Sequence, residues 1–152
     1  MYGTPPEEPQ EKETKIIREV RERVSYESIL LTALRDAYFV LARGGNGIEA
    51  INSFWSILTP DLQEALSDAR KRFIRRLNEA NKWFNEATAS DFQYLGSKKV
   101  LSAQRSEHYQ QCLSELKQKQ HFACLEFLSE IVRVLDEAGM LRRYRREEVG
   151  EY

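Results

Sequence analysis

Apolar residues recur at steps of three and four along most of the chain, which is the spacing of one helical face. In the first segment this stripe consists of Ile17, Val20, Val24, Leu31, Leu34, Tyr38 and Leu41. Glu27 interrupts the stripe at one position. The pattern predicts a helix over residues 12–43, either continuous or broken near Ser25.

Glycine, asparagine and proline mark the ends of the next elements. Residues 44–47 read GGNG and can supply the left-handed geometry that closes a helix. A short apolar helix is expected over residues 48–58. Thr59 and Pro60 then predict a new start, because threonine caps free N–H groups and proline fits the first turn. We expect this third helix to run to about Ala87.

The rest of the pattern predicts a linker and one long final helix. Residues 88–96 contain Ser90, Asp91 and Gly96, which favour a linker. Residues 98–138 contain neither glycine nor proline, and Gly139 stands where a helix-ending glycine is expected. The sequence shows no competing strand pattern. The expected fold is therefore all-α, an antiparallel bundle of three long helices and one short helix.

Composition favours one helical domain between two tails. The 152 residues, 41% of them hydrophobic, suit a single domain. Residues 1–13 combine three prolines with an excess of acid, so we expect a flexible tail there. The bundle would then span residues 14–140, and residues 141–152 would form a tail that is first basic and then acidic.

Several features point to a cytoplasmic protein without a membrane segment. The longest apolar runs are far shorter than the ~20 residues that a bilayer needs, and the N-terminal residues are polar. Cys112 and Cys124 share the predicted final helix, where their separation corresponds to about 18 Å of rise, too far for a disulfide. We expect reduced thiols in a reducing compartment.

Catalytic and metal-binding motifs are sparse. The sequence shows no hydrolytic triad, phosphate-binding loop, CxxC pair or Glu-x-x-His pair, so we expect neither an enzyme nor a cofactor. One set carries the residue types of a zinc site: His108, Cys112, His121 and Cys124. On one continuous helix the first two point well away from the last two, which favours ordinary polar and core positions instead.

The third predicted helix carries a row of basic and amide side chains, which we call the basic ridge. It consists of Lys71, Arg75, Asn78, Lys82 and Asn85, and Arg70, Arg72 and Arg76 flank it. The ridge lies opposite the apolar stripe and should face outward. A straight row of cations can follow a phosphate backbone, although basic residues near a helix C-terminus also suit the helix dipole.

Two further surfaces are candidates for contact. A glutamine column on the final helix consists of Gln104, Gln111 and Gln118, with Phe122 close by. An uncharged column on so charged a protein is typical of a protein contact, for example between copies of the chain. The alternative is that the glutamines are aligned by chance. The C-terminal tail places Arg142, Arg143, Arg145 and Arg146 around Tyr144. These arginines could bind phosphate or pair with Glu147 and Glu148 at a frayed helix end.

A helical chain of this size, with the basic run from Arg70 to Arg76, resembles the small subunit of class 1 CRISPR effector complexes. The resemblance is architectural and covers residues 12–146. It implies a noncatalytic subunit that packs in copies within a ribonucleoprotein filament and steadies a nucleic-acid strand through backbone contacts.

The hypothesis from sequence is therefore a noncatalytic helical subunit of a nucleoprotein assembly. Lys71, Arg75 and Lys82 would contact single-stranded DNA or RNA phosphates, assisted by the flanking and C-terminal arginines. The alternative is a homo-oligomeric scaffold or protein-binding adaptor without nucleic-acid contact, which the near-balanced net charge of −1 favours. Both predict protein subunits as partners, and neither predicts a membrane or a small-molecule substrate.

Overall fold

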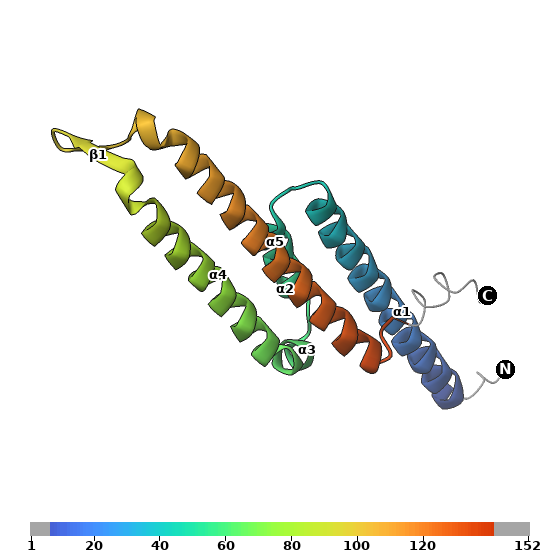
Figure 1. The fold of residues 1–152 in the computed structure, drawn as a ribbon. Helices are drawn as coiled ribbons and strands as arrows, with labels where there is room; N and C mark the ends of the chain where they lie inside the picture. The colour runs from blue at the N-terminus through green and yellow to red at the C-terminus, as the bar shows by residue number, and fades with distance from the viewer. Residues whose placement is uncertain (1–6, 142–152) are drawn as a thin grey trace, which may run out of the picture.

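The computed structural model describes residues 7–141, with side chains from residue 14 onward except at position 24. This part of the chain is mainly helical (Figure 1), as the sequence predicts. The elements in chain order are α1 Glu7–Ala42, α2 Gly47–Ser56, α3 Pro60–Ala65, α4 Ser67–Thr88, η1 Ala89–Asp91, β1 Phe92–Leu95, β2 Lys98–Leu101, η2 Ala103–Arg105 and α5 Ser106–Glu137. None of the helices described is long and apolar enough to cross a membrane.

Helix α1 is longer than the sequence predicts. It begins at Glu7, so it takes in residues 7–13 of the expected flexible tail, and it passes Ser25 without a break. The predicted glycine end is confirmed. Gly44 has a φ of 73°, and the N–H of Gly45 donates to the Val40 carbonyl at 2.9 Å, which is the long hydrogen bond of a Schellman end.

The predicted third helix is divided at Leu66. Its start is confirmed, since Thr59 Oγ1 accepts a hydrogen bond from the Leu62 N–H at 3.4 Å. Leu66, between α3 and α4, has a φ of −99° and ψ of 5° and is fully buried. Its N–H and carbonyl keep their hydrogen bonds to Leu62 and Arg70. The chain thus changes direction here without losing backbone hydrogen bonds, and a core residue occupies the bend.

The predicted linker forms a β-hairpin instead. Strands β1 and β2 pair antiparallel, from Phe92 opposite Leu101 to Leu95 opposite Lys98. Gly96 has a φ of 67°, the left-handed value that a two-residue turn with glycine first requires. The expectations of no strand and of a helix from residue 98 are therefore wrong. The absence of glycine and proline from residues 98–105 is compatible with a helix. Residues 98–101 nevertheless form a strand, because they pair with β1.

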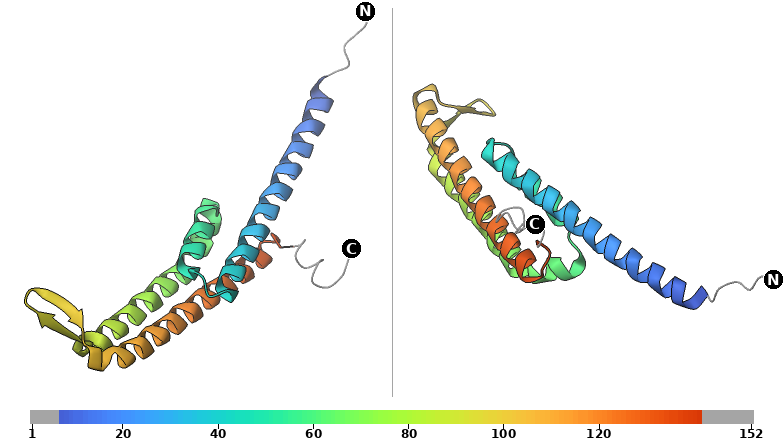
Figure 2. Two further views of the ribbon diagram at one scale, coloured as in Figure 1. Left: turned by 90° about the horizontal axis from the view of Figure 1, so that it is seen from above. Right: turned by 90° about the vertical axis from the view of Figure 1, so that its right-hand side faces the viewer.

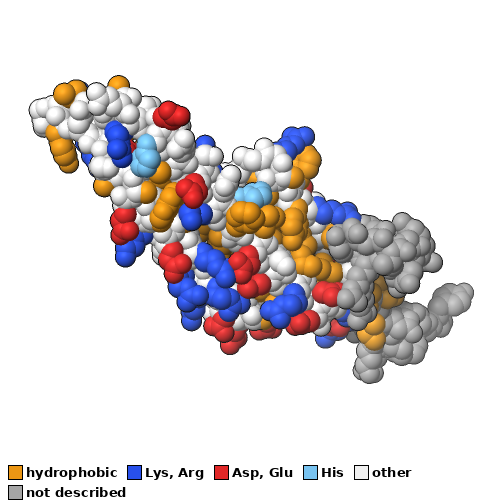
Figure 3. All heavy atoms as spheres, viewed as in Figure 1, with side chains coloured by type: hydrophobic (Ala, Val, Ile, Leu, Met, Phe, Trp, Pro, Cys, Tyr) orange, Lys and Arg blue, Asp and Glu red, His pale blue; other side chains and the backbone are white. Residues whose placement is uncertain are grey.

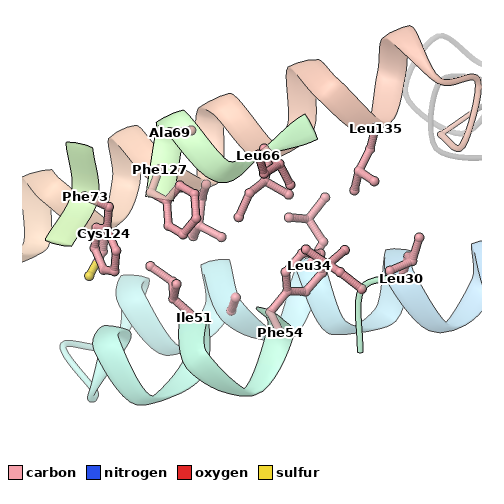
Figure 4. Close-up of a cluster of buried hydrophobic side chains, with 14 of the residues drawn as sticks. Leu30, Leu34, Ile51, Phe54, Leu66, Ala69, Phe73, Cys124, Phe127 and Leu135 are labelled. Atoms are coloured by element: carbon pink, nitrogen blue, oxygen red, sulfur yellow. The ribbon is translucent and has the colours of Figure 1, made fainter. Parts of the chain in front are cut away.

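The core lies where α2 and the second half of α1 meet the α4–α5 pair. Helices α4 and α5 run side by side in opposite directions and make the most extensive contact (Figures 1 and 2). Phe73 of α4 stacks on Phe127 of α5 with ring centroids 4.8 Å apart. Figure 4 shows that the core extends from this pair between the helices, with these further apolar side chains: Leu30, Leu34, Ile51, Phe54, Leu66, Ala69, Cys124 and Leu135. Gly139, with a φ of 72°, ends α5 as predicted.

The N-terminal half of α1 projects beyond the rest of the molecule (Figure 2). We call residues 7–25 the α1 arm. All side chains over residues 14–23 are exposed, and Ile16, Ile17 and Val20 are 59%, 57% and 57% exposed. Ile17 and Val20 belong to the predicted apolar stripe, but they do not reach the core. The apolar stripe runs on along α1, but α1 packs on the core only from Tyr26 onward.

Candidate functional site

The basic ridge lies on the solvent side of α4. Its five members, Lys71, Arg75, Asn78, Lys82 and Asn85, are all exposed. The buried residues of the same helix, among them Phe73 and Ala80, occupy the opposite side. The outward orientation that the sequence predicts is thus confirmed.

Most arginines near the ridge face carboxylates of the same chain. Arg72 Nη2 lies 3.0 Å from Glu130 Oε2, and Arg76 pairs with Glu126, so both arginines join α4 to α5. Arg75 Nε lies 4.0 Å from Glu79 Oε1 one turn along α4. Figure 3 shows basic and acidic side chains interleaved on this face. The positive potential available to a phosphate backbone is correspondingly reduced.

The C-terminal arginines and the glutamine column are the other two predicted contact surfaces. Residues 142–146, with their four arginines, lie outside the described residues. The glutamine column is exposed as expected at Gln111 and Gln118 of α5. Gln104 is exposed too, but it belongs to η2 and not to the helix on which the column was predicted. Phe122 is 69% exposed, the largest fraction for a described phenylalanine.

Phe122 stands at the side of an open groove of about 1020 Å³, which we call the α5 groove. One wall is the connection between α1 and α2, and the other is the middle of α5. The connection lies close to its neighbours, because a Cβ on Gly47 would come 2.3 Å from Leu41 Cδ2 and 3.2 Å from Cys124 Sγ. Figure 3 shows hydrophobic side chains beside a histidine in this region.

The lining of the α5 groove is apolar, amide and basic. Leu41, Ile48 and Phe122 provide apolar surface, whereas Lys117 and His121 are the lining residues that can carry positive charge. Aspartate and glutamate are not among the described residues that line it. Chemically, the groove suits an apolar side chain that stands next to a carboxylate.

At the base of the β-hairpin, Asp91 gathers the contacts of three segments. Its fully buried carboxylate accepts hydrogen bonds from Arg105 Nε at 2.9 Å and His108 Nδ1 at 2.8 Å. The N–H of Ser102 donates to the Asp91 carbonyl at 2.8 Å. Burial by itself would raise the pKa of Asp91, but the hydrogen bonds and charges of Arg105 and His108 outweigh it and lower that pKa. We call Asp91, Arg105 and His108 the hairpin clasp.

The clasp also reaches a thiol. Cys112 Sγ lies 3.6 Å from His108 Nε2, and His108 Nδ1 contacts Asp91. The three side chains thus contact one another in the order found in a cysteine–histidine–aspartate triad. The triad is not visible as a sequence motif, because Asp91 is remote along the chain from the other two. Acyl transfer also needs N–H groups aimed at the developing oxyanion. The Cys112 N–H belongs to the hydrogen-bond ladder of α5, so this arrangement suits a structural role.

The four candidate zinc ligands are divided between two places. His108 and Cys112 belong to the hairpin end of α5, whereas His121 and Cys124 line the α5 groove. No cluster of three or more His, Cys, Asp or Glu side chains that could hold a metal ion occurs in the described part of the chain. Both cysteines are free and buried.

The α1 arm is a candidate contact surface that the sequence alone does not reveal. The apolar stripe that contains Ile17 and Val20 is visible in the sequence. Its spacing is the same whether that side of the helix packs on another element or faces solvent. What distinguishes the two is the length of the elements available for packing. Helix α5 ends at Glu137, and α1 extends well beyond this end (Figure 2).

Comparison with known protein families, characterised proteins and solved structures finds no match to this chain.

Proposed function

We propose that this protein is a noncatalytic cytoplasmic scaffold that assembles through helix–helix contacts with protein chains, including copies of itself. The observation that carries the proposal is the uncovered apolar surface of the α1 arm, with Ile16, Ile17 and Val20 each more than half exposed. An isolated helix of this length is only marginally stable in water, and exposed apolar side chains on it favour a partner. The exposed Phe122 beside the α5 groove supports the same reading.

Sedimentation velocity of the full chain from about 1 to 100 µM tests this proposal, since this range covers association free energies of about −5 to −8 kcal/mol. We expect the weight-average mass to rise with concentration. Phe122→Asp should reduce the association if the α5 groove takes part in it, and Glu115→Gln, at an exposed position elsewhere on α5, should leave it unchanged. A monomer over the whole range would contradict self-assembly.

A second candidate is the nucleoprotein subunit that the CRISPR resemblance implies. The observation that favours it is the outward basic ridge, where Lys71 and Lys82 are exposed beside Asn78. Against it, Arg72, Arg75 and Arg76 have carboxylates of this chain as neighbours. The scaffold proposal therefore stands first.

Fluorescence anisotropy of labelled single-stranded DNA and RNA tests the second candidate. If the ridge binds phosphates, Lys71→Glu/Lys82→Glu should abolish an affinity that falls steeply between about 50 and 200 mM salt. The matched control is Lys98→Glu/Lys117→Glu, which makes the same charge change at exposed positions on β2 and α5. Equal losses in the two variants would indicate a net-charge effect and not a site.

A further inference from the structure

The α5 groove suits a segment in which apolar side chains stand next to carboxylates, and the chain carries such a segment. We infer that residues 147–152 occupy the α5 groove of their own chain. This inference rests on the proposed scaffold function and deepens it, because a partner chain that uses the groove has to displace the segment. Residues 142–152 lie outside the described residues, and three of their properties favour docking: their charge, their apolar side chains and their reach from Leu141.

The charges of the groove and of the segment are opposite. Lys117 and His121 line the groove, and no aspartate or glutamate is among the described residues of its lining. Arg43 and Glu49, which are exposed beside the connection between α1 and α2, have opposite charges and leave this balance unchanged. Residues 147–152 read EEVGEY, with three glutamates and no basic residue. The groove and the segment are therefore electrostatically complementary.

The apolar side chains match as well. Val149 and Tyr152 each stand beside a glutamate or one residue from it in the sequence. The groove offers Ile48 and the 69% exposed ring of Phe122 as apolar surface, which docking would remove from water. Residues 142–146 read RRYRR and carry the charge of the lysine and not of its partner, so the same lining disfavours them. The acidic part of the tail, and not its basic part, is the one that fits.

The tail is long enough to reach the groove. The N–H of Met140 donates to the Leu135 carbonyl at 2.9 Å, and Leu141 is buried in the core, so the described chain ends beside the last turns of α5. From Leu135 back to Phe122, α5 rises about 20 Å. Residues 142–149 can span up to about 26 Å when extended. The valine at position 149 can therefore reach Phe122 before the chain is fully stretched.

The other end of the chain cannot make this contact. Residues 1–6 precede Glu7 at the tip of the α1 arm, which lies far from the connection between α1 and α2 (Figure 2). The helix from Glu7 to Ala42 is about 54 Å long, whereas residues 1–6 span at most about 20 Å. Of the two terminal segments outside the described residues, the C-terminal one alone reaches the groove of its own chain.

Tethering makes a weak contact sufficient. A short flexible tether holds the segment beside the groove at an effective concentration on the order of millimolar. A contact that has a dissociation constant of about 1 mM as a free peptide would then be about half occupied within one chain. A protein partner has to exceed this internal competitor, so the segment sets a threshold for occupation of the groove.

Disulfide trapping tests the contact in the full chain. Under mild oxidation at about 1 µM, far below the effective concentration of a tethered segment, Gly150→Cys/Gln118→Cys should form a disulfide within one chain. The matched control is Gly150→Cys/Lys82→Cys. Position 82 lies outside the groove at the same height along the α4–α5 pair as position 118, because its neighbour Trp83 meets Lys119 with the Lys119 Nζ 4.8 Å from the ring centroid.

We expect the internal disulfide to form in the groove pair and not in the control pair. Equal yields in the two would show a tail without a preferred site and would overturn the inference. Disulfides that join two chains, without internal ones, would place the segment in the groove of a second copy and would also overturn it. The native thiols are buried and give the same background in every sample.

The role of charge is tested in the same groove pair. Adding Glu147→Gln/Glu148→Gln should lower the yield of internal disulfide about fivefold, since two exposed ion pairs together contribute about this factor. The matched control, Glu64→Gln/Glu86→Gln, removes the same charge at exposed positions on α3 and α4 and should leave the yield unchanged. An undiminished yield in the first variant would overturn recognition of the segment by its acidic residues.

The outcomes separate this inference from the scaffold proposal, because sedimentation measures self-assembly independently. Self-association of a chain that forms no internal disulfide would overturn docking of the segment and retain the scaffold. A selective internal disulfide in a chain that stays monomeric at all concentrations would support docking and contradict self-assembly. A monomer without the internal disulfide would overturn both.

Discussion

At the scale of single residues, Asp91 is a buried carboxylate that joins η1 to two residues beyond the β-hairpin. A buried carboxylate is costly unless it is paired, and here a guanidinium and an imidazole both donate to it. Its partners Arg105 and His108 lie on the far side of the β-hairpin in the sequence. The sequence marked Asp91 only as a linker residue, because nothing local indicates that the chain returns to it after the hairpin.

The lowered pKa of Asp91 predicts a pH dependence of stability. A carboxyl whose pKa is lower in the folded than in the unfolded state stabilises the fold above the unfolded value of about 3.8, and this contribution is lost as pH falls through the folded value. Wild type should therefore exceed Asp91→Asn in free energy of unfolding at pH 7, and the difference should shrink below pH 4. Urea titrations at pH 7, 5 and 3 measure it, with Glu115→Gln as the exposed control. A difference that stays constant with pH would contradict this role.

Both thiols should react slowly with thiol reagents in the native protein. Cys112 and Cys124 are both buried, and burial raises the pKa of Cys124 to about 11. At pH 8 this implies about a hundredfold less Cys124 thiolate than at the ordinary pKa of 9.0. Labelling by an aromatic disulfide reagent in Cys112→Ser should be slow in the native protein and rapid in urea. Rapid native labelling would show that Cys124 is accessible through the α5 groove.

At the scale of elements, the sequence predicts those features that depend on local periodicity and caps. The ends of α1 and α5 at glycines and the start of α3 at Thr59 follow from local chemistry, and all three are confirmed. The bend at Leu66 and the β-hairpin were missed, because both depend on contacts with remote residues. The Leu66 side chain packs into a core that is built mainly from other helices. The contacts of the hairpin clasp hold the two ends of the β-hairpin together.

The close approach of the α1–α2 connection predicts a packing defect for Gly47→Ala. The added Cβ would lie 2.3 Å from Leu41 Cδ2, and Leu41 is itself a buried core residue that cannot move freely. We expect a loss of about 1–3 kcal/mol in the free energy of unfolding, as for other overpacked cores. The exposed position Asn52 on α2 gives the control, because Asn52→Ala should stay within about 0.5 kcal/mol of wild type in the same urea titration.

At the scale of the whole molecule, α1 belongs to two environments. Its second half is held in the body from Tyr26 onward, where the Tyr26 hydroxyl donates to the Ile57 carbonyl at 2.9 Å. Its first half is the exposed arm. The sequence predicted the outward basic ridge but not the partners of the flanking arginines, since Glu126 and Glu130 lie far along the chain from Arg76 and Arg72. Such pairings are a property of the assembled α4–α5 pair and not of either helix.

This division predicts the effect of removing the arm. Deletion of residues 1–23 should leave the thermal unfolding midpoint of the dilute protein nearly unchanged, because every core residue of α1 lies beyond it. The same deletion should abolish the concentration-dependent association. Differential scanning calorimetry and sedimentation of the truncated and full chains measure the two effects. A large fall of the unfolding midpoint in dilute solution would show that the arm contributes to the fold of a single chain.

The β-hairpin offers a practical point of attachment. It stands at the other end of the molecule from the α1 arm, and its turn at Gly96 has open space around it, with Tyr94 and Leu95 exposed beside it (Figure 1). A short peptide tag inserted after Gly96 would extend into solvent. Protein captured on a biosensor surface through this tag would present its arms to the liquid phase, whereas an N-terminal tag would hold them against the surface.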